Sequence, residues 1–177
     1  MLLIRGKQRL FLPSIDVAFS QNSLMLGLAH AFLFFTLPTT YASTNTTIQN
    51  RCDFSVYVAA ANCTYGSATN TSILLPNHTF TYELPPDHSN CGQTIKLANN
   101  TNLQEPYQIE WSTDLNGIIW YDLSAVDGNP FLGYRRFMQV ASGNESCHSL
   151  LCLPGETACE WPAMHDCLDG DIAFTLC

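Results

Sequence analysis

Two aspartates lie five residues apart around a serine in the segment 120–128, which has the sequence WYDLSAVDG. Asp122 and Asp127 flank Ser124, and Gly128 ends the segment with a residue typical of turns. Paired carboxylates of this kind can carry acid–base chemistry on sugars, accept hydrogen bonds from a polar ligand, or cap a turn through bonds to backbone amides. The segment therefore predicts a turn that presents acidic side chains.

The first 42 residues have the pattern of a targeting segment. An apolar run over residues 25–37 is followed by Pro38 and by Thr40-Tyr41-Ala42, a small-x-small pattern typical of signal-peptide cleavage. The run is shorter than the roughly 20 residues that a membrane-spanning helix needs. We expect an N-terminal extension and signal peptide over residues 1–42, with Met25 as an alternative start, and one secreted domain over residues 43–177 without a membrane span.

The charge balance excludes one class of partner. The formal net charge is −8, and few basic residues follow the predicted leader: Arg51, Lys96, Arg135 and Arg136. Nucleic-acid binding needs clustered cations, which this chain does not provide. We expect a monomer that binds neither nucleic acid nor a cofactor.

All eight cysteines follow the predicted leader, and an even count in a secreted chain indicates disulfide bonds. They are Cys52, Cys63, Cys91, Cys147, Cys152, Cys159, Cys167 and Cys177. His148 and His165 lie among the last of them and could suggest zinc. Because the spacing lacks a paired Cys-x2-Cys arrangement, we expect disulfides and no metal.

Residues 147–177 carry five of the cysteines and few apolar runs, so bridges must replace core in this lobe. Five is odd, so at least one bridge must reach back to the first three cysteines if all are paired. The simplest scheme joins Cys52 to Cys177 and Cys63 to Cys91, and pairs the other four among themselves. It is one of roughly a hundred possible pairings.

Six Asn-x-Ser/Thr sequons fit the same compartment and predict glycosylated surface loops. They are Asn45, Asn62, Asn70, Asn77, Asn99 and Asn144.

Short alternating segments predict an all-β fold. Residues 48–61 alternate apolar and polar side chains, as one half-buried first strand would. Asn116-Gly117, between Trp111 and Trp120, is a strong hairpin signal. The other predicted strands cover residues 72–75, 79–84, 93–97, 107–112, 118–123, 137–140 and 172–176. The rhythm favours an antiparallel β-sandwich with a small disulfide-rich C-terminal lobe.

Five aromatic residues could form a platform on which sugar rings stack: Tyr107, Trp111, Trp120, Tyr121 and Trp161. Large rings also stabilise the core of a small sandwich, so we expect at most one or two of them to be exposed. Ser124 lacks the Gly-x-Ser-x-Gly turn that activates a serine nucleophile, so a serine hydrolase is not expected.

Three segments resemble thaumatin-like proteins. They are the opening NRCDFSVYVAA of residues 50–60, the strand QIEWS of residues 108–112, and the YDLSAVDG of residues 121–128. Together with the short cysteine-rich tail, they are most similar to the reduced fungal branch, the yeast-phase-specific or antigenic thaumatin-like proteins. The resemblance implies a β-sandwich of the thaumatin/osmotin type and supports a bridge between Cys52 and Cys177.

The resemblance also implies an acidic cleft. Many plant members line it with an Arg, a Glu and three Asp, and it is linked with β-1,3-glucan binding and sometimes with hydrolysis. Glu110, Asp122 and Asp127 match this pattern. The family's Arg falls within residues 93–97, where this chain has only Lys96, which cannot form the two parallel bonds of an Arg. The shortened C-terminal lobe offers three candidates for the remaining Asp: Asp166, Asp169 and Asp171.

We therefore predict that the protein binds cell-wall or other extracellular polysaccharide, with β-1,3-glucan as the implied polymer and no turnover. Two alternatives remain open. One is an endo-β-1,3-glucanase whose catalytic pair comes from Glu110, Asp122 and Asp127. The other is a surface antigen, adhesin or effector that binds a host protein.

Overall fold

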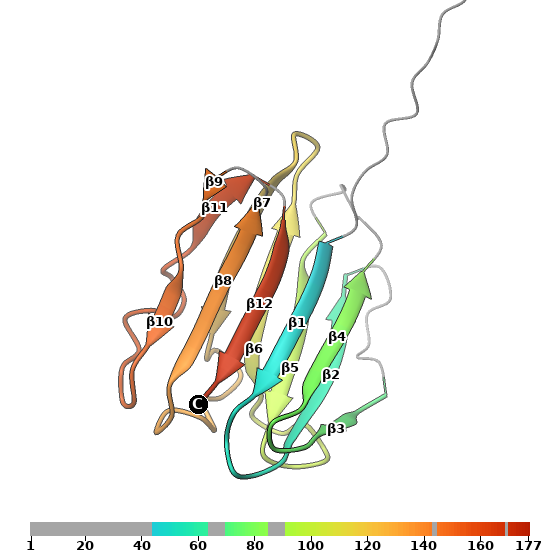
Figure 1. The fold of residues 1–177 in the computed structure, drawn as a ribbon, viewed down its shortest axis with the longest axis vertical. Helices are drawn as coiled ribbons and strands as arrows, with labels where there is room; N and C mark the ends of the chain where they lie inside the picture. The colour runs from blue at the N-terminus through green and yellow to red at the C-terminus, as the bar shows by residue number, and fades with distance from the viewer. Residues whose placement is uncertain (1–43, 64–69, 85–90, 143–144, 169) are drawn as a thin grey trace, which may run out of the picture. The chain divides into compact units, whose positions relative to one another are not determined.

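The computed structural model describes residues 44–63, 70–84, 91–142, 145–168 and 170–177, and the predicted leader lies outside these ranges. The described residues form twelve strands in two sheets that face each other (Figure 1). The first sheet has the order β10 (Leu150–Cys152), β8 (Arg136–Ser142), β12 (Asp171–Leu176), β1 (Thr44–Asn50) and β4 (Thr79–Leu84), with β9 (Glu145–Ser146) beside β8. The second has the order β11 (His165–Leu168), β7 (Ile118–Ser124), β6 (Tyr107–Thr113), β5 (Gln93–Ala98), β2 (Val56–Asn62) and β3 (Ser72–Leu74).

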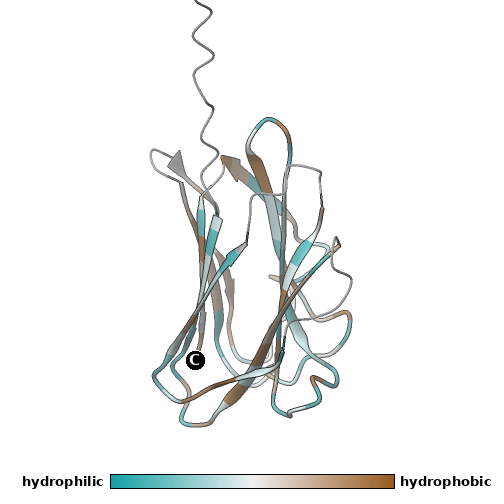
Figure 2. Cartoon of the chain, turned by 90° about the vertical axis from the view of Figure 1, so that its right-hand side faces the viewer, coloured by the Kyte–Doolittle hydropathy of each residue, from teal (hydrophilic) through white to brown (hydrophobic). Residues whose placement is uncertain are grey.

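The core lies between the two sheets, which Figure 2 shows edge-on. Side chains alternate along each strand, so one face of the second sheet supplies buried residues such as Val58, Ile95 and Ile109. Phe174 and Met138 of the first sheet belong to the same buried cluster. The predicted all-β sandwich is confirmed. Among the residues described, no helix is long and apolar enough to cross a membrane.

One strand pair departs from the predicted antiparallel pattern. β1 pairs with β12 in parallel, with Thr46 opposite Ile172 and Asn50 opposite Leu176. The Cys52–Cys177 disulfide follows this pair and joins residues 125 positions apart. The first and last strands described are therefore neighbours in the middle of the first sheet.

The prediction of one strand over residues 48–61 is wrong. The segment contributes to two strands in different sheets, β1 and β2. The side chain of Asn50 explains the break, because its Nδ2 donates to the carbonyls of Phe54 and Leu74 and its Oδ1 accepts from the backbone N–H of Cys52. These bonds satisfy backbone N–H and C=O groups in a turn that connects the two sheets. The alternation of apolar residues continues across this turn.

The predicted hairpin at Asn116-Gly117 is confirmed, since it joins β6 to β7. Gly117 has a φ of 76°, which glycine adopts without steric cost. Asp114 accepts the backbone N–H groups of Asn116 and Ile118 through Oδ1, at 2.8 and 2.9 Å. These bonds, the one from Ile118 first, lower the pKa of the Asp114 carboxyl. The turn therefore fixes the register in which β6 and β7 pair.

Four disulfides join all the cysteines, in pairs that agree with the simplest scheme: Cys52–Cys177, Cys63–Cys91, Cys147–Cys167 and Cys152–Cys159. The last two staple the predicted C-terminal lobe. Its cysteines are consumed by these bonds, which leaves no thiolates for the zinc site considered above.

The predicted sequons differ in exposure. Asn70, Asn77 and Asn99 are exposed, whereas Asn45 in β1 and Asn62 at the end of β2 are only partly exposed. Asn144 lies outside the described ranges. Occupancy of these sequons remains a prediction.

Candidate functional site

The register of β6 and β7 places Glu110 directly opposite Asp122. Their chain neighbours Ile109, Tyr121 and Leu123 point into the core, so both carboxylates lie on the outer face of the second sheet. Directly opposed residues in an antiparallel pair have Cβ atoms about 4.5–5.5 Å apart. The fold therefore brings together two acids that are twelve positions apart in the sequence.

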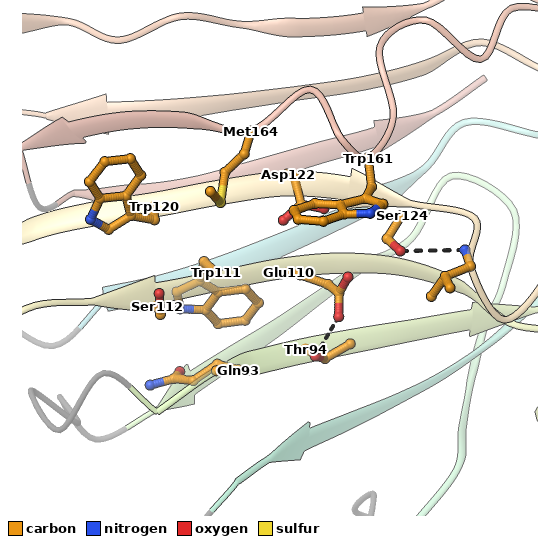
Figure 3. A pocket seen from close by; sticks show the side chains of 12 residues that line it. Gln93, Thr94, Glu110, Trp111, Ser112, Trp120, Asp122, Ser124, Trp161 and Met164 are labelled. Atoms are coloured by element: carbon orange, nitrogen blue, oxygen red, sulfur yellow. Dashed lines mark hydrogen bonds between the residues drawn. The ribbon is translucent and has the colours of Figure 1, made fainter.

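A third polar residue extends this row onto β5. Thr94 lies opposite Glu110 in the β5–β6 register, and its hydroxyl donates to Glu110 Oε1 at 3.4 Å. The row Thr94–Glu110–Asp122 thus crosses three adjacent strands on the outer face (Figure 3).

Asp122 is the most buried acid of the row, with 6% of its surface exposed. Burial raises its pKa to about 6, with a smaller contribution from the negative charge of Glu110. Its Oδ2 has no hydrogen-bond partner among the described residues. A buried carboxylate with an unpaired oxygen favours a ligand that donates a hydrogen bond or carries positive charge.

The segment between β10 and β11 covers part of this outer face. The backbone N–H of Trp161 donates to the carbonyl of Leu123 on β7 at 2.7 Å, which ties the segment to the sheet. Trp161 and Met164 project from it toward the row of acids (Figure 3). Asp122 therefore lies beneath a partial roof.

Together these elements enclose an open cavity of about 390 Å³. Glu110, Asp122 and the three tryptophans of the chain are among the residues that line it. Trp120 and Trp161 are 39% and 57% exposed, whereas Trp111 is buried, as are Tyr107 and Tyr121. The prediction that one or two of the five aromatic residues are exposed is confirmed.

Three residues of the lining each have a buried polar atom that lacks a hydrogen-bond partner within the described ranges: Gln93 Oε1, Trp111 Nε1 and Asp122 Oδ2. Buried polar groups are normally satisfied, so such a group of unpaired atoms needs an explanation. The residues that carry this donor and these two acceptors all line the same cavity, and such groups match the hydroxyl-rich surface of a sugar.

Lys96 and Asp127 pair with each other and do not line the cavity. Lys96 Nζ lies 3.2 Å from Asp127 Oδ2, and both side chains are partly exposed. Lys96 follows Thr94 by two residues on β5, so the ion pair lies farther along the same outer face. The structure thus brings Glu110 and Asp122 together and places the other two predicted residues beside them.

The three candidates for a further Asp lie in different places. Asp166 on β11 is opposite Trp120 in the β7–β11 register and is exposed. Asp171 belongs to β12 in the other sheet, where its Oδ1 accepts the backbone N–H of Asn45 at 3.0 Å. Asp169 lies outside the described residues. Among the three, Asp166 alone is placed on the sheet that carries Glu110 and Asp122.

Sequence reasoning missed Gln93 and Met164. Gln93 precedes Thr94 on β5 and lies opposite Trp111, and Met164 lies just before β11. No local pattern marks either residue, because both reach the cavity through strand register and the path of a long connection.

The comparisons with known proteins agree with this architecture. The family model described as "Bys1: Blastomyces yeast-phase-specific protein" matches residues 33–177. No curated protein sequence matches the chain. Among solved structures, the protein elicitor MoHrip2 from Magnaporthe oryzae is 24% identical, with a TM-score of 0.66 over 76% of this chain and 98% of the elicitor.

The thaumatin-like xylanase inhibitor TLXI is 17% identical, with a TM-score of 0.54 over 75% of this chain and 98% of the inhibitor. At these identities the two structures show a shared thaumatin-like fold. Four disulfides in such a fold are typical of an extracellular protein. Because the family model covers most of the sequence, the chain belongs to the Blastomyces yeast-phase-specific protein family, and its fold is thaumatin-like.

Proposed function

We propose that this thaumatin-like protein is secreted and binds extracellular or cell-wall polysaccharide at the cavity beside Glu110 and Asp122, without cleaving it. The observation that carries the proposal is that Gln93, Trp111 and Asp122, which all line one cavity, each have a buried polar atom without a hydrogen-bond partner among the described residues. Aromatic side chains at the rim, Trp120 and Trp161, offer flat apolar surfaces for sugar rings.

The resemblance to glucan-binding thaumatin-like proteins makes β-1,3-glucan the first polymer to test. The purified protein is mixed with insoluble β-1,3-glucan, chitin and cellulose, and the fraction that sediments with each polymer is measured. Retention by at least one polymer, reduced in Trp161→Ala, supports the proposal. The proposal fails if no polymer retains the protein above a bovine albumin control.

A hydrolase is the second candidate, because one specific observation favours it. A raised pKa is what a general acid of a glycosidase needs, and Asp122 has it while facing a second carboxylate, Glu110. The assay measures the release of reducing ends from a soluble β-1,3-glucan. If the wild type releases them and both Glu110→Gln and Asp122→Asn do not, the function is hydrolysis and not binding alone. Equal release by wild type and variants would assign the activity to a contaminant.

The interpretation as an antigen or effector that binds a host protein has a different requirement. In this interpretation the cleft no longer binds a ligand, so the carboxylate side chains need not point into one site. Of the three predicted carboxylates, Glu110 and Asp122 line one cavity, whereas Asp127 pairs with Lys96 outside it. The convergence of the first two supports a small polar ligand or a sugar chain.

A further inference from the structure

The cavity has an unbalanced charge. Its lining includes the carboxylates of Glu110 and Asp122, and none of the described residues that line it is a Lys, Arg or His. Lys96, the basic residue nearest along β5, is paired with Asp127 instead. When both carboxylates are ionised, the protein supplies no opposite charge in the lining that the structure describes, so a bound cation would relieve the repulsion.

Asp122 shows where that charge is needed. The residue is only 6% exposed and lines the cavity, and its Oδ2 has no hydrogen-bond partner in the described part of the chain. An ionised carboxylate can only accept hydrogen bonds, so its partner must be a donor. An ammonium group satisfies both requirements, because it donates three N–H bonds and carries a positive charge.

The rim of the cavity suits the same group. The indoles of Trp120 and Trp161 are partly exposed there, and the face of an indole attracts a cation within about 6 Å. Trp111 Nε1 can donate to a ligand oxygen, and Gln93 Oε1 can accept from a hydroxyl. The lining therefore combines a cation site with partners for neutral hydroxyl groups.

We propose that the cavity binds a sugar unit that carries a free amino group, with its ammonium bonded to the carboxylates of Asp122 and Glu110. This inference rests on the proposed polysaccharide binding and narrows the ligand to polymers that contain glucosamine, such as partly deacetylated chitin. Acetylation of the amino group removes the charge and leaves one neutral N–H donor. The bond to Asp122 then has charge on the carboxylate alone and loses the attraction between opposite charges.

The test compares two sugars that differ only in acetylation. Binding of glucosamine hexamer, N-acetylglucosamine hexamer and a β-1,3-linked glucose hexamer to the purified protein is measured by calorimetry at pH 6.5. We expect the glucosamine hexamer to bind about tenfold more tightly than either neutral sugar, as one charge-assisted bond would give. Equal or tighter binding of a neutral hexamer overturns the inference and leaves polysaccharide binding intact, whereas binding of none of the three overturns both.

Matched variants distinguish binding at the cavity from a general attraction of the cationic sugar to an acidic protein. Glu110→Gln and Asp122→Asn should each weaken glucosamine binding about tenfold and leave the neutral sugars within about twofold. Glu83→Gln is the control, because it removes the same charge from an exposed residue on β4 of the other sheet. An equal loss in this control would assign the binding to net charge and overturn the inference. Thermal unfolding of each variant verifies that it is folded.

Discussion

Arg136 and Glu160 form a buried ion pair, with Arg136 Nη2 and Glu160 Oε1 3.1 Å apart and the two side chains 0% and 4% exposed. The guanidinium also donates to the carbonyls of Phe131 and Tyr134, and Glu160 accepts from Asn129. One arginine thus joins β8 to the connection that precedes it and to the connection between β10 and β11. Because Glu160 directly precedes Trp161, the pair also holds the segment that roofs the cavity.

Glu160→Ala should strongly destabilise the fold, because it leaves Arg136 buried without a counter-charge. We expect the free energy of unfolding to fall by about 3–5 kcal/mol, measured by denaturant titration. Glu83→Ala, at an exposed site on β4, is the control and should stay within about 0.5 kcal/mol of wild type. A loss of less than about 1 kcal/mol in Glu160→Ala would show that the pair does not hold the segment.

Asp122→Asn should stabilise the fold at neutral pH. The pKa of Asp122 is raised from 3.8 to about 6, so the folded protein binds this proton more tightly than the unfolded chain does. The resulting stabilisation is complete below about pH 4 and is lost as the pH rises through about 6. The variant removes the cost of the buried charge, and we expect a gain on the order of 2 kcal/mol at pH 7.

The measurement is the free energy of unfolding of both proteins between pH 4 and pH 7.5. The wild type should lose stability relative to Asp122→Asn across this range. If the difference in unfolding free energy between wild type and variant does not change with pH, the raised pKa of Asp122 is contradicted. If the variant is more stable yet binds less ligand, then Asp122 is retained for binding at a cost in stability.

Most of the fold follows from local sequence patterns. Predicted strands such as residues 79–84, 107–112 and 118–123 fall inside observed strands because each alternates over enough residues to show its period. β10 and β11 were not predicted, since they have three and four residues and include cysteines that bridge to other segments. The break at Asn50 was missed because its side chain bonds to Leu74, a contact that no local pattern shows.

The site was only partly predictable for a related reason. The motif over residues 121–128 identifies acids but does not distinguish Asp122, which faces the cavity, from Asp127, which pairs with Lys96. That difference depends on the β6–β7 register and on the loop after β7. Trp161 was a candidate platform residue by its type alone, and its place over the cavity depends on the bond to Leu123.

Gly128→Ala should weaken the turn that ends the motif. A Cβ at this position would lie well inside van der Waals contact with the backbone carbonyl of Glu105, so one of the two loops must shift. We expect a loss of about 1–3 kcal/mol in the free energy of unfolding. Gly133→Ala is the matched control, because nothing lies within 4 Å of its added Cβ. Equal stability of the two variants would show that the approach of the loops is not required.

Trp161→Ala should impair binding while leaving stability nearly unchanged. The indole is 57% exposed at the rim of the cavity, so its removal exposes little core but deletes a surface for a sugar ring or a cation. We expect affinity for a retained polysaccharide or its oligomers to fall about tenfold, and Trp161→Phe to lie between the two. Ile73→Ala on β3 is the control, since that side chain is 58% exposed and lies away from the cavity lining. Wild-type affinity in Trp161→Ala would exclude the rim from the site and confine binding to the floor formed by Glu110 and Asp122.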